Sequence, residues 1–324
     1  MLLMGAEAPL KQRCDARQSS RQYVLLAPSQ SAASQFDQAV VDPSRHHRLL
    51  AQAQSLRGRI YLQDGAVQPS DLLADDRHIQ AADFQAWHLL TLDENETVVA
   101  CIRYFAHEAG VRFSELSVAG SGIAQSTELG TRVREAVETE LDYARRRGVW
   151  FVELGGWAVC ESLRCSTEAI RTLLTVYALS QVRGGAVGLS SATVRHHSSS
   201  ILKRIGGRPL KASGGEVSSY YDVQYACEME LLSFDSDFPN DRYARWIRDC
   251  RAALPQVPVV VGSPAESGAS DLLRLHAAVG GPFEAGYPAG RTGRDETVVP
   301  SLRSHIKFAS AGKGGCYTGQ NCSR

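Results

Sequence analysis

The chain has 324 residues, and its 35 Lys and Arg residues balance its 35 Asp and Glu residues, so it is formally neutral at pH 7. Hydrophobic residues make up 44% of it, which is enough for a buried core. No apolar run reaches the ~18 residues that cross a bilayer, and the first ten residues lack the basic start of a signal peptide. We therefore expect a cytoplasmic protein without a membrane span. The eight cysteines show no paired metal-ligand spacing, so no metal site is predicted.

Composition divides the chain into three parts. Residues 1–40 are rich in Gln, Ser and Ala without apolar periodicity, and we expect them to be disordered. Residues 41–262 have the helix and strand patterns of a single α/β domain. Residues 263–324 are dominated by Gly, Pro, Ser and Thr, which predicts a loosely ordered tail. In that tail, Cys316 and Cys322 either form a small disulfide loop or stay unpaired.

Alternating or continuous apolar residues predict strands over 87–90, 98–103 and 113–118. The second of these ends in Arg103, whose guanidinium is suited to a substrate carboxylate or to an ordinary salt bridge. The third contains Glu115, a second candidate for a substrate-binding carboxylate. Residues 127–147 then have apolar residues on one face and charges on the other, which predicts an amphipathic helix ended by Gly148.

The next predicted strand, over residues 150–159, contains one acidic residue, Glu153. A carboxylate in an apolar strand is costly to bury unless it is paired or used, so Glu153 is the first candidate for a base or for a ligand of an ammonium group. A position facing solvent is the alternative. The paired Gly155 and Gly156 indicate either a β-bulge whose N–H groups bind a carbonyl oxygen or space for Trp157.

Two predicted helix starts concentrate positive charge. One helix follows the turn 160–165, with Ser166 or Thr167 as its N-cap, and ends at 184–185; a strand over 187–194 then leads to a helix opened by Ser198. Helix N-termini favour anions. Between residues 164 and 211 Glu168 is the only acid, and this segment predicts an anion site formed by Val159, Arg164, Ser166, Thr167, Arg171, Arg195 and Ser198.

Further side chains are candidates for moving protons. His196 lies where the strand over 187–194 meets the helix that follows it, so it is a candidate acid or base, or else an exposed loop residue. Tyr220 and Tyr221 precede the predicted last strand over 227–234; either phenol is a candidate acid, and Tyr221 is the one chosen.

The order strand, turn, helix, strand, helix over residues 148–207 resembles the cofactor-binding half of the GNAT acyltransferase superfamily. The run from Glu153 to Val159 is similar to the pattern Glu-Leu-Ser-Arg-aromatic-x-Val of its N-acyl amino acid synthase and acyl-homoserine-lactone synthase branch. The resemblance spans roughly residues 45–235 and implies a GNAT-like α+β fold, a mixed, twisted sheet flanked by helices. It implies Glu153, His196 and Tyr221 as catalytic residues, and Arg103, Glu115, Gly155, Gly156 and Trp157 as substrate-binding residues.

The activity implied by the resemblance is the transfer of an acyl group, fatty acyl in this branch, to the amine of a small molecule such as an amino acid. Acyl-CoA or acyl carrier protein is the donor, and no cofactor stays bound. Gly156 stands where the branch has Arg, and the turn at 164–169 lacks the glycine spacing of acetyl-CoA enzymes, which favours a carrier-protein donor.

Other functions remain as alternatives. The loss of that Arg leaves open a catalytically silent acyl- or carrier-protein-binding module, and a homoserine-lactone-type signal synthase is the narrower enzymatic alternative. Nucleic-acid binding is not favoured, because the basic segment has few aromatic residues for stacking.

Overall fold

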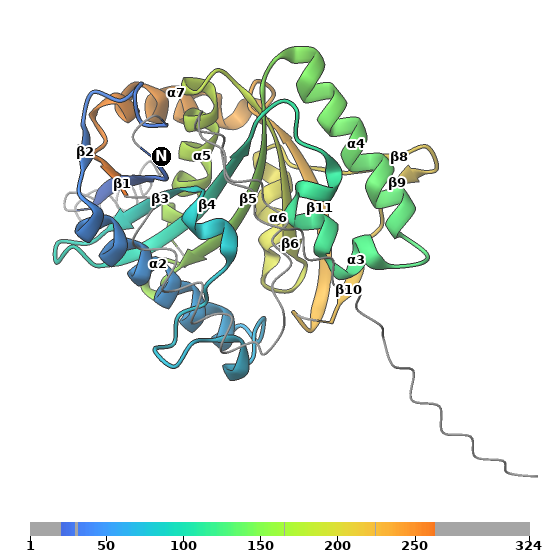
Figure 1. The fold of residues 1–324 in the computed structure, drawn as a ribbon, viewed down its shortest axis with the longest axis horizontal. Coiled ribbons are helices and arrows are strands. Elements are labelled where there is room, and N and C mark those ends of the chain that lie inside the picture. Colours follow the sequence, from blue (N-terminus) through green and yellow to red (C-terminus); the bar gives the residue numbers. More distant parts are fainter. Residues whose placement is uncertain (1–20, 30–31, 165, 224, 263–324) are drawn as a thin grey trace, which may run out of the picture. The chain divides into compact units, whose positions relative to one another are not determined.

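A computed structural model describes residues 21–29, 32–164, 166–223 and 225–262 (Figure 1). The chain divides into two compact units, Met1–Gly286 and Tyr287–Arg324, and every described residue belongs to the first. The predicted tail over 263–324, with Cys316 and Cys322, lies outside the described residues.

A mixed sheet forms the centre of this unit, as predicted. Its strands follow one another in space in the order β10, β11, β6, β5, β4, β3, β1, β12, β2, while β7 pairs with β11. Their bounds are β1 (Gln22–Ala27), β2 (Ala39–Val41), β3 (Trp87–Leu92), β4 (Val98–His107), β5 (Trp150–Val159), β6 (Ala186–Thr193), β7 (Arg208–Pro209), β10 (Tyr220–Asp222), β11 (Cys227–Asp235) and β12 (Val259–Val261). A separate hairpin pairs β8 (Lys211–Ala212) with β9 (Gly215–Glu216).

The pairing changes direction at β5. Strands β1, β3, β4 and β5 are antiparallel neighbours, whereas β5 and β6 run parallel and β6 pairs antiparallel with β11. Parallel neighbours need a crossover connection, and α5 (Glu168–Val182) provides it. The helix predicted after Arg164 and the strand that follows it are therefore confirmed.

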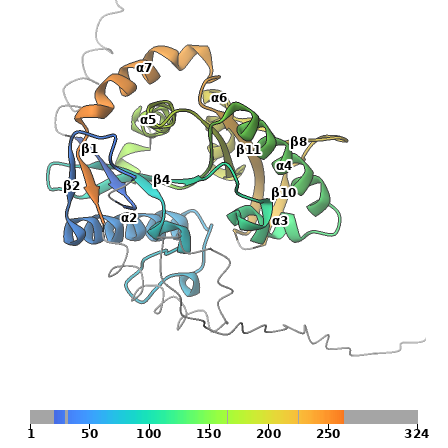
Figure 2. The same ribbon diagram turned by 45° about the horizontal axis from the view of Figure 1, so that its top comes forward.

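Helices cover both faces of the sheet (Figure 2). On one face lie α5, α6 (Ser198–Ile205) and α7 (Ala244–Ala253), which share a core cluster. On the other face, α2 (Pro43–Gln63) and α4 (Gly130–Arg147) each cover their own cluster, and α3 (Gly122–Gln125) packs beside α4. Gly148 ends α4 with φ 66°, as the sequence predicted.

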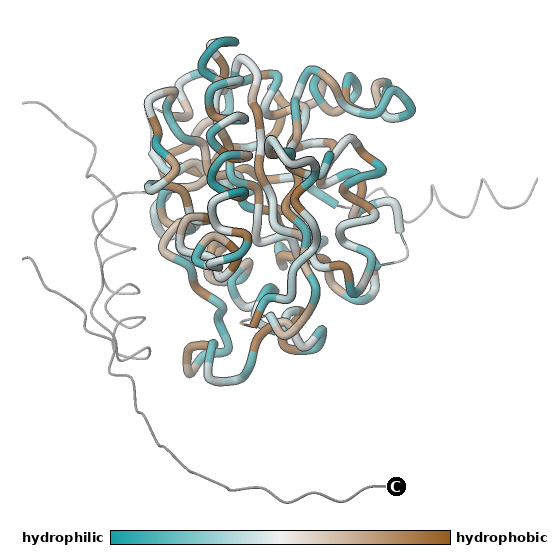
Figure 3. The backbone as a smooth tube through the Cα atoms, turned by 90° about the vertical axis from the view of Figure 1, so that its right-hand side faces the viewer, coloured by the Kyte–Doolittle hydropathy of each residue, from teal (hydrophilic) through white to brown (hydrophobic). Residues whose placement is uncertain are grey.

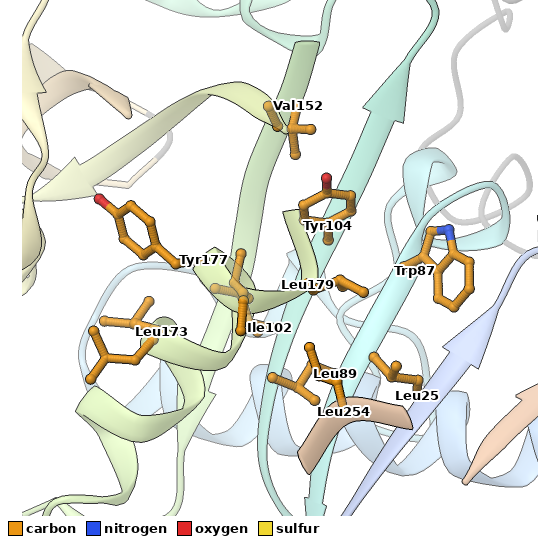
Figure 4. Close-up of a cluster of buried hydrophobic side chains, with 14 of the residues drawn as sticks. Leu25, Trp87, Leu89, Ile102, Tyr104, Val152, Leu173, Tyr177, Leu179 and Leu254 are labelled. Carbon is orange, nitrogen blue, oxygen red and sulfur yellow. The ribbon is translucent and has the colours of Figure 1, made fainter. Parts of the chain in front are cut away.

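Strand alternation sends neighbouring residues to opposite cores. Leu25 packs on the α5 side and Val24 on the α2 side, and both are fully buried. Figure 4 shows Leu25, Leu89 and Ile102 from three successive strands in the cluster that α5 covers. Figure 3 shows hydrophobic and hydrophilic stretches alternating along the chain, as expected of elements with one buried face.

Two sequence predictions are corrected by these elements. Part of the segment expected to be disordered forms β1 and β2, and β1 is buried between β3 and β12. A six-residue apolar strand inside a polar segment has too little length to show periodicity. The predicted strand over 113–118 is wrong, because this segment forms the 3₁₀ turns Phe113–Glu115 and Ser117–Gly120.

Among the described helices, none has the length and apolarity needed to cross a bilayer.

Candidate active site

The parallel strands β5 and β6 separate along their length. Their pairing ends where Leu154 meets Ser190, although β5 continues to Val159 and β6 to Thr193. Beyond this point β5 pairs only with β4, and β6 only with β11. A cavity of about 550 Å³ occupies the opening. This volume lies within the usual range for small-molecule sites.

A β-bulge shapes one wall of the cavity. Arg103 pairs with Gly155 and Cys101 with Ala158, so β5 has one more residue than β4 across this step. Gly156 lies in the bulge with φ 62°, a conformation that favours glycine. The bulge predicted from Gly155 and Gly156 is therefore confirmed.

A buried charge cluster lies behind the bulge. The Asp83 carboxylate accepts hydrogen bonds from Arg57 Nη1 at 2.9 Å and from Arg103 Nη1 at 2.9 Å, and Arg57 Nη2 makes a further short contact with it. Arg57 Nη2 also donates to the His78 carbonyl at 2.8 Å. Burial alone would raise the pKa of Asp83, but the two guanidinium groups hold it well below its usual range.

The cluster has more positive than negative charge. Two guanidinium groups surround one carboxylate, and Arg103 lines the cavity together with Gln80. Among the described buried atoms, Nε of Arg57, Nε of Arg103 and Nε1 of Trp157 have no hydrogen-bond partner. A buried donor of this kind is costly unless a ligand or water satisfies it. An anionic group in the cavity next to Arg103 would balance the charge.

Glu153 also lines the cavity, but its carboxylate oxygens are occupied. Oε2 accepts from His107 Nε2, Ser117 N and Ser117 Oγ, each at 3.0 Å, and Oε1 accepts from Val118 N at 3.1 Å. Burial would raise its pKa, but the His107 and backbone hydrogen bonds outweigh burial and lower it. This geometry suits an anchor for the wall at residues 117–118 more than the base or ammonium ligand that the sequence suggested.

Two arginines meet at the mouth of the cavity. Arg164 follows β5 and donates to Asp64 Oδ1 at 2.9 Å, while Arg195 follows β6 and donates to the Gly65 carbonyl at 3.0 Å. Both therefore reach the C-terminal end of α2 from the two separated strands. Ser198 and Val159 line the same cavity.

Phenol groups lie on the wall formed by β10 and the turn after it. Tyr220 and Tyr225 line the cavity, and burial raises the pKa of both. Tyr221, the candidate from the sequence, alternates to the other side of β10 and is 66% exposed. The strand pairing of β10, which places Tyr220 opposite Met229, decides which of the two tyrosines faces inward.

The remaining predicted residues lie away from the cavity lining. Ser166 Oγ accepts from the Glu168 N–H at 3.1 Å, and Thr167 occupies the N-cap position without a side-chain cap. Arg171 affects the pKa of Tyr23 on another side of α5. Glu115 bonds with Arg112 on the surface. The backbone of His196 lies in the 3₁₀ turn Arg195–His197, and its side chain is outside the described part of the molecule.

Several residues of the site were not predicted from the sequence. They are Arg57, Asp64, Gln80, Asp83, Asp222 and Tyr225. One signal was present for α2, where Asp42 precedes Pro43 and accepts from Arg45 N at 2.9 Å, as an N-cap does. No local pattern pointed to Asp83.

No protein-family model and no curated protein matches this chain. Several solved structures are similar to it. FeeM, an N-acyl amino acid synthase from uncultured soil microbes, has 13% identity and a TM-score of 0.37, covering 61% of this chain and 88% of its own. BjaI, a CoA-dependent acyl-homoserine lactone synthase solved with SAM and isopentyl-CoA, has 12% identity and a TM-score of 0.45, covering 78% and 98%.

The AHL synthase LasI has 15% identity and a TM-score of 0.38, covering 67% of this chain and 89% of its own. The succession β5, turn, α5, β6, α6 is the one that the sequence resemblance implied over residues 148–207, and β5 and β6 run parallel. The described part of the chain has a mixed sheet flanked by helices, and its cavity lies where the parallel strands β5 and β6 separate.

Proposed function

We propose that the chain is an N-acyltransferase that moves an acyl group from a phosphopantetheine thioester to the amine of a small molecule such as an amino acid. The supporting observation is the cavity between β5 and β6, which has cationic groups both at its mouth, in Arg164 and Arg195, and at its inner wall, in Arg103. An elongated donor with a phosphate at one end and an acceptor with a carboxylate fit this distribution of charge.

The donor arm matches the separated strand edges. A pantetheine arm has two amides, which can form backbone-like hydrogen bonds. Residues 155–159 of β5 are not paired with β6, so their backbone groups on that side are available to such an arm. In this proposal the arm takes the place of a strand between β5 and β6. The thioester carbonyl then lies against backbone N–H groups near the Gly156 bulge, where hydrogen bonds stabilise the oxyanion.

A small apolar cavity favours a hydrocarbon chain on the donor. It has a volume of about 30 Å³ and shares the side chains of Leu154, Leu173 and Leu202 with the main cavity. Rotation of these side chains would join the two spaces. In this proposal an acyl chain longer than acetyl would enter the apolar region between α5, α6 and the sheet once these side chains have rotated.

Side chains of the cavity wall bind the acceptor and serve the proton transfers. Arg103 binds the acceptor carboxylate, and the amine attacks the thioester carbon while the C–S bond breaks. The phenols of Tyr220 and Tyr225 line the cavity and carry a proton at neutral pH, as tyrosines ordinarily do, so either one can donate a hydrogen bond to the departing thiolate. Glu153 holds the wall at residues 117–118, and solvent takes the amine proton unless His196 does so.

Transfer is tested with purified protein, acyl carrier protein or CoA loaded with acyl chains of several lengths, and a pool of amino acids and amines. Mass spectrometry should find N-acyl products that Arg103→Met abolishes for amino acids. Arg112→Met is the matched control, because the Arg112 side chain is 76% exposed and lies outside the cavity lining. Donor binding without any product would support the silent binding module, and a lactone product would support the signal synthase.

A further inference from the structure

The mouth of the cavity contains an acidic side chain next to the basic ones. Asp64 is the C-cap residue of α2, and its carboxylate lines the cavity 2.9 Å from Arg164 Nη2. The C-terminal end of a helix disfavours a negative charge. Arg164 therefore compensates an otherwise unfavourable carboxylate, and part of its charge is no longer available to a ligand.

Several N–H groups in the described part of the turn before α5 are also engaged in hydrogen bonds within the turn. A diphosphate cradle requires backbone N–H groups that point at the ligand. Here N–H groups of the turn donate to acceptors within the turn at 3.0–3.1 Å, namely those of Leu163, Arg164, Ser166 and Glu168. Glu161 adds a further exposed carboxylate to this turn.

We propose that Asp64 is a specificity-determining residue that disfavours donors with a diphosphate, and so discriminates against free CoA. This inference depends on the proposed acyltransfer from a phosphopantetheine thioester. Arg164, Arg195 and Asp64 together leave a net charge of +1 at the mouth. That charge matches the single phosphodiester of a phosphopantetheine arm on a carrier protein. It does not match the diphosphate and 3′-phosphate of CoA.

The test compares the same acyl group on CoA and on pantetheine, which has no phosphate. Asp64→Asn should raise the ratio of kcat/KM for acyl-CoA to that for acyl-pantetheine by roughly tenfold, because the repulsion between a carboxylate and a nearby diphosphate in a water-like medium has an effect of this order. Asp142→Asn is the matched control. It also removes the acid of an Arg–Asp pair, at 2.7 Å from Arg145, but on α4 and away from the cavity lining.

Each outcome decides the proposal. An unchanged ratio in Asp64→Asn, or an equal loss with both donors, would overturn the role of Asp64. If the wild-type protein transfers no acyl group from CoA, pantetheine or carrier protein to any amine, the proposed function fails instead. The discrimination against CoA can then still be measured by calorimetry with CoA alone. The Asp64→Asn variant should bind CoA about tenfold more tightly than both the wild type and Asp142→Asn. Equal affinities would refute it.

Discussion

His107 Nε2 donates a hydrogen bond to Glu153 Oε2 at 3.0 Å, and this pair connects β4 to β5 diagonally, because Phe105 is the residue directly opposite Glu153. The same carboxylate receives the N–H groups of Ser117 and Val118. Glu153 therefore holds the 3₁₀ turn Ser117–Gly120 against the sheet. This 3₁₀ turn forms part of the cavity wall. Both the stability of the fold and the shape of the site therefore depend on Glu153.

Glu153→Gln should lower the free energy of unfolding at pH 7 by about 1–3 kcal/mol, because the amide accepts fewer hydrogen bonds and its NH₂ faces other donors. The pKa of Glu153 is lowered in the folded state. Its stabilising contribution is therefore present above the unfolded pKa of about 4.3, and it is lost as the pH falls through the folded pKa. Urea titrations should show the difference from wild type shrinking below about pH 4. A difference that stayed constant down to pH 3 would contradict this assignment.

Asp83→Asn should lower the free energy of unfolding by more than most single substitutions do. Asp83 is 1% exposed and interacts with both Arg57 and Arg103. Its loss leaves two buried guanidinium groups without a counter-ion, for which a cost of about 3–5 kcal/mol is expected. Thermal and urea unfolding measure this cost. Asp142→Asn, which breaks an exposed ion pair, should change stability by less than about 1 kcal/mol. Similar losses in both variants would argue against an uncompensated charge cluster.

Arg103→Lys tests acceptor recognition separately from chemistry. Lysine keeps the charge but cannot form the paired hydrogen bonds of a guanidinium. We expect kcat/KM for an amino acid to fall by about 10–100-fold. The same amine without its carboxylate should be a poor substrate for the wild type and should be affected little by the substitution. An equal loss with both acceptors would show that Arg103 acts through the fold and not through a carboxylate.

The sequence predicted those features that depend on neighbouring residues. The amphipathic pattern before Gly148 and the paired glycines in β5 are local signals, and the helix and the bulge were both found. The Asp83 cluster is different, because its partners lie 26 and 20 residues away in the chain. Only the packing of α2 against β4 and β5 brings them together.

Dependence on contacts between distant residues also explains why the sequence did not predict which tyrosine faces inward or which residue pairs with Arg164 at the mouth of the cavity. Tyr220 and Tyr221 are equivalent in the sequence until the pairing of β10 with β11 places one of them inward. Arg164 was predicted from its position before a helix, but its partner Asp64 lies 100 residues earlier. Local chemistry thus predicted Arg103, Arg164 and Arg195 but not Arg57, and tertiary contacts determine how much of their charge a ligand meets.

Two glycines with nearly equal φ angles allow the cost of a left-handed backbone to be distinguished from the cost of steric crowding in the bulge. Gly156 has φ 62° and Gly148 has φ 66°. A Cβ on Gly148 would meet no atom within 4 Å, whereas one on Gly156 would lie 2.7 Å from Arg57 Nη1. Arg57 cannot move away easily, since Asp83 and the His78 carbonyl hold its guanidinium.

Gly148→Ala should therefore cost only the ~1–2 kcal/mol of a left-handed alanine. Gly156→Ala should cost this amount plus about 1–3 kcal/mol of overpacking. It should also reduce acyl transfer by an order of magnitude or more, because the N–H groups of the bulge shift away from the thioester carbonyl. Urea unfolding and steady-state kinetics on both variants measure the two effects. Equal stability and equal activity of the two alanine variants would show that the bulge tolerates a side chain, and the proposed oxyanion contact would then have to lie elsewhere.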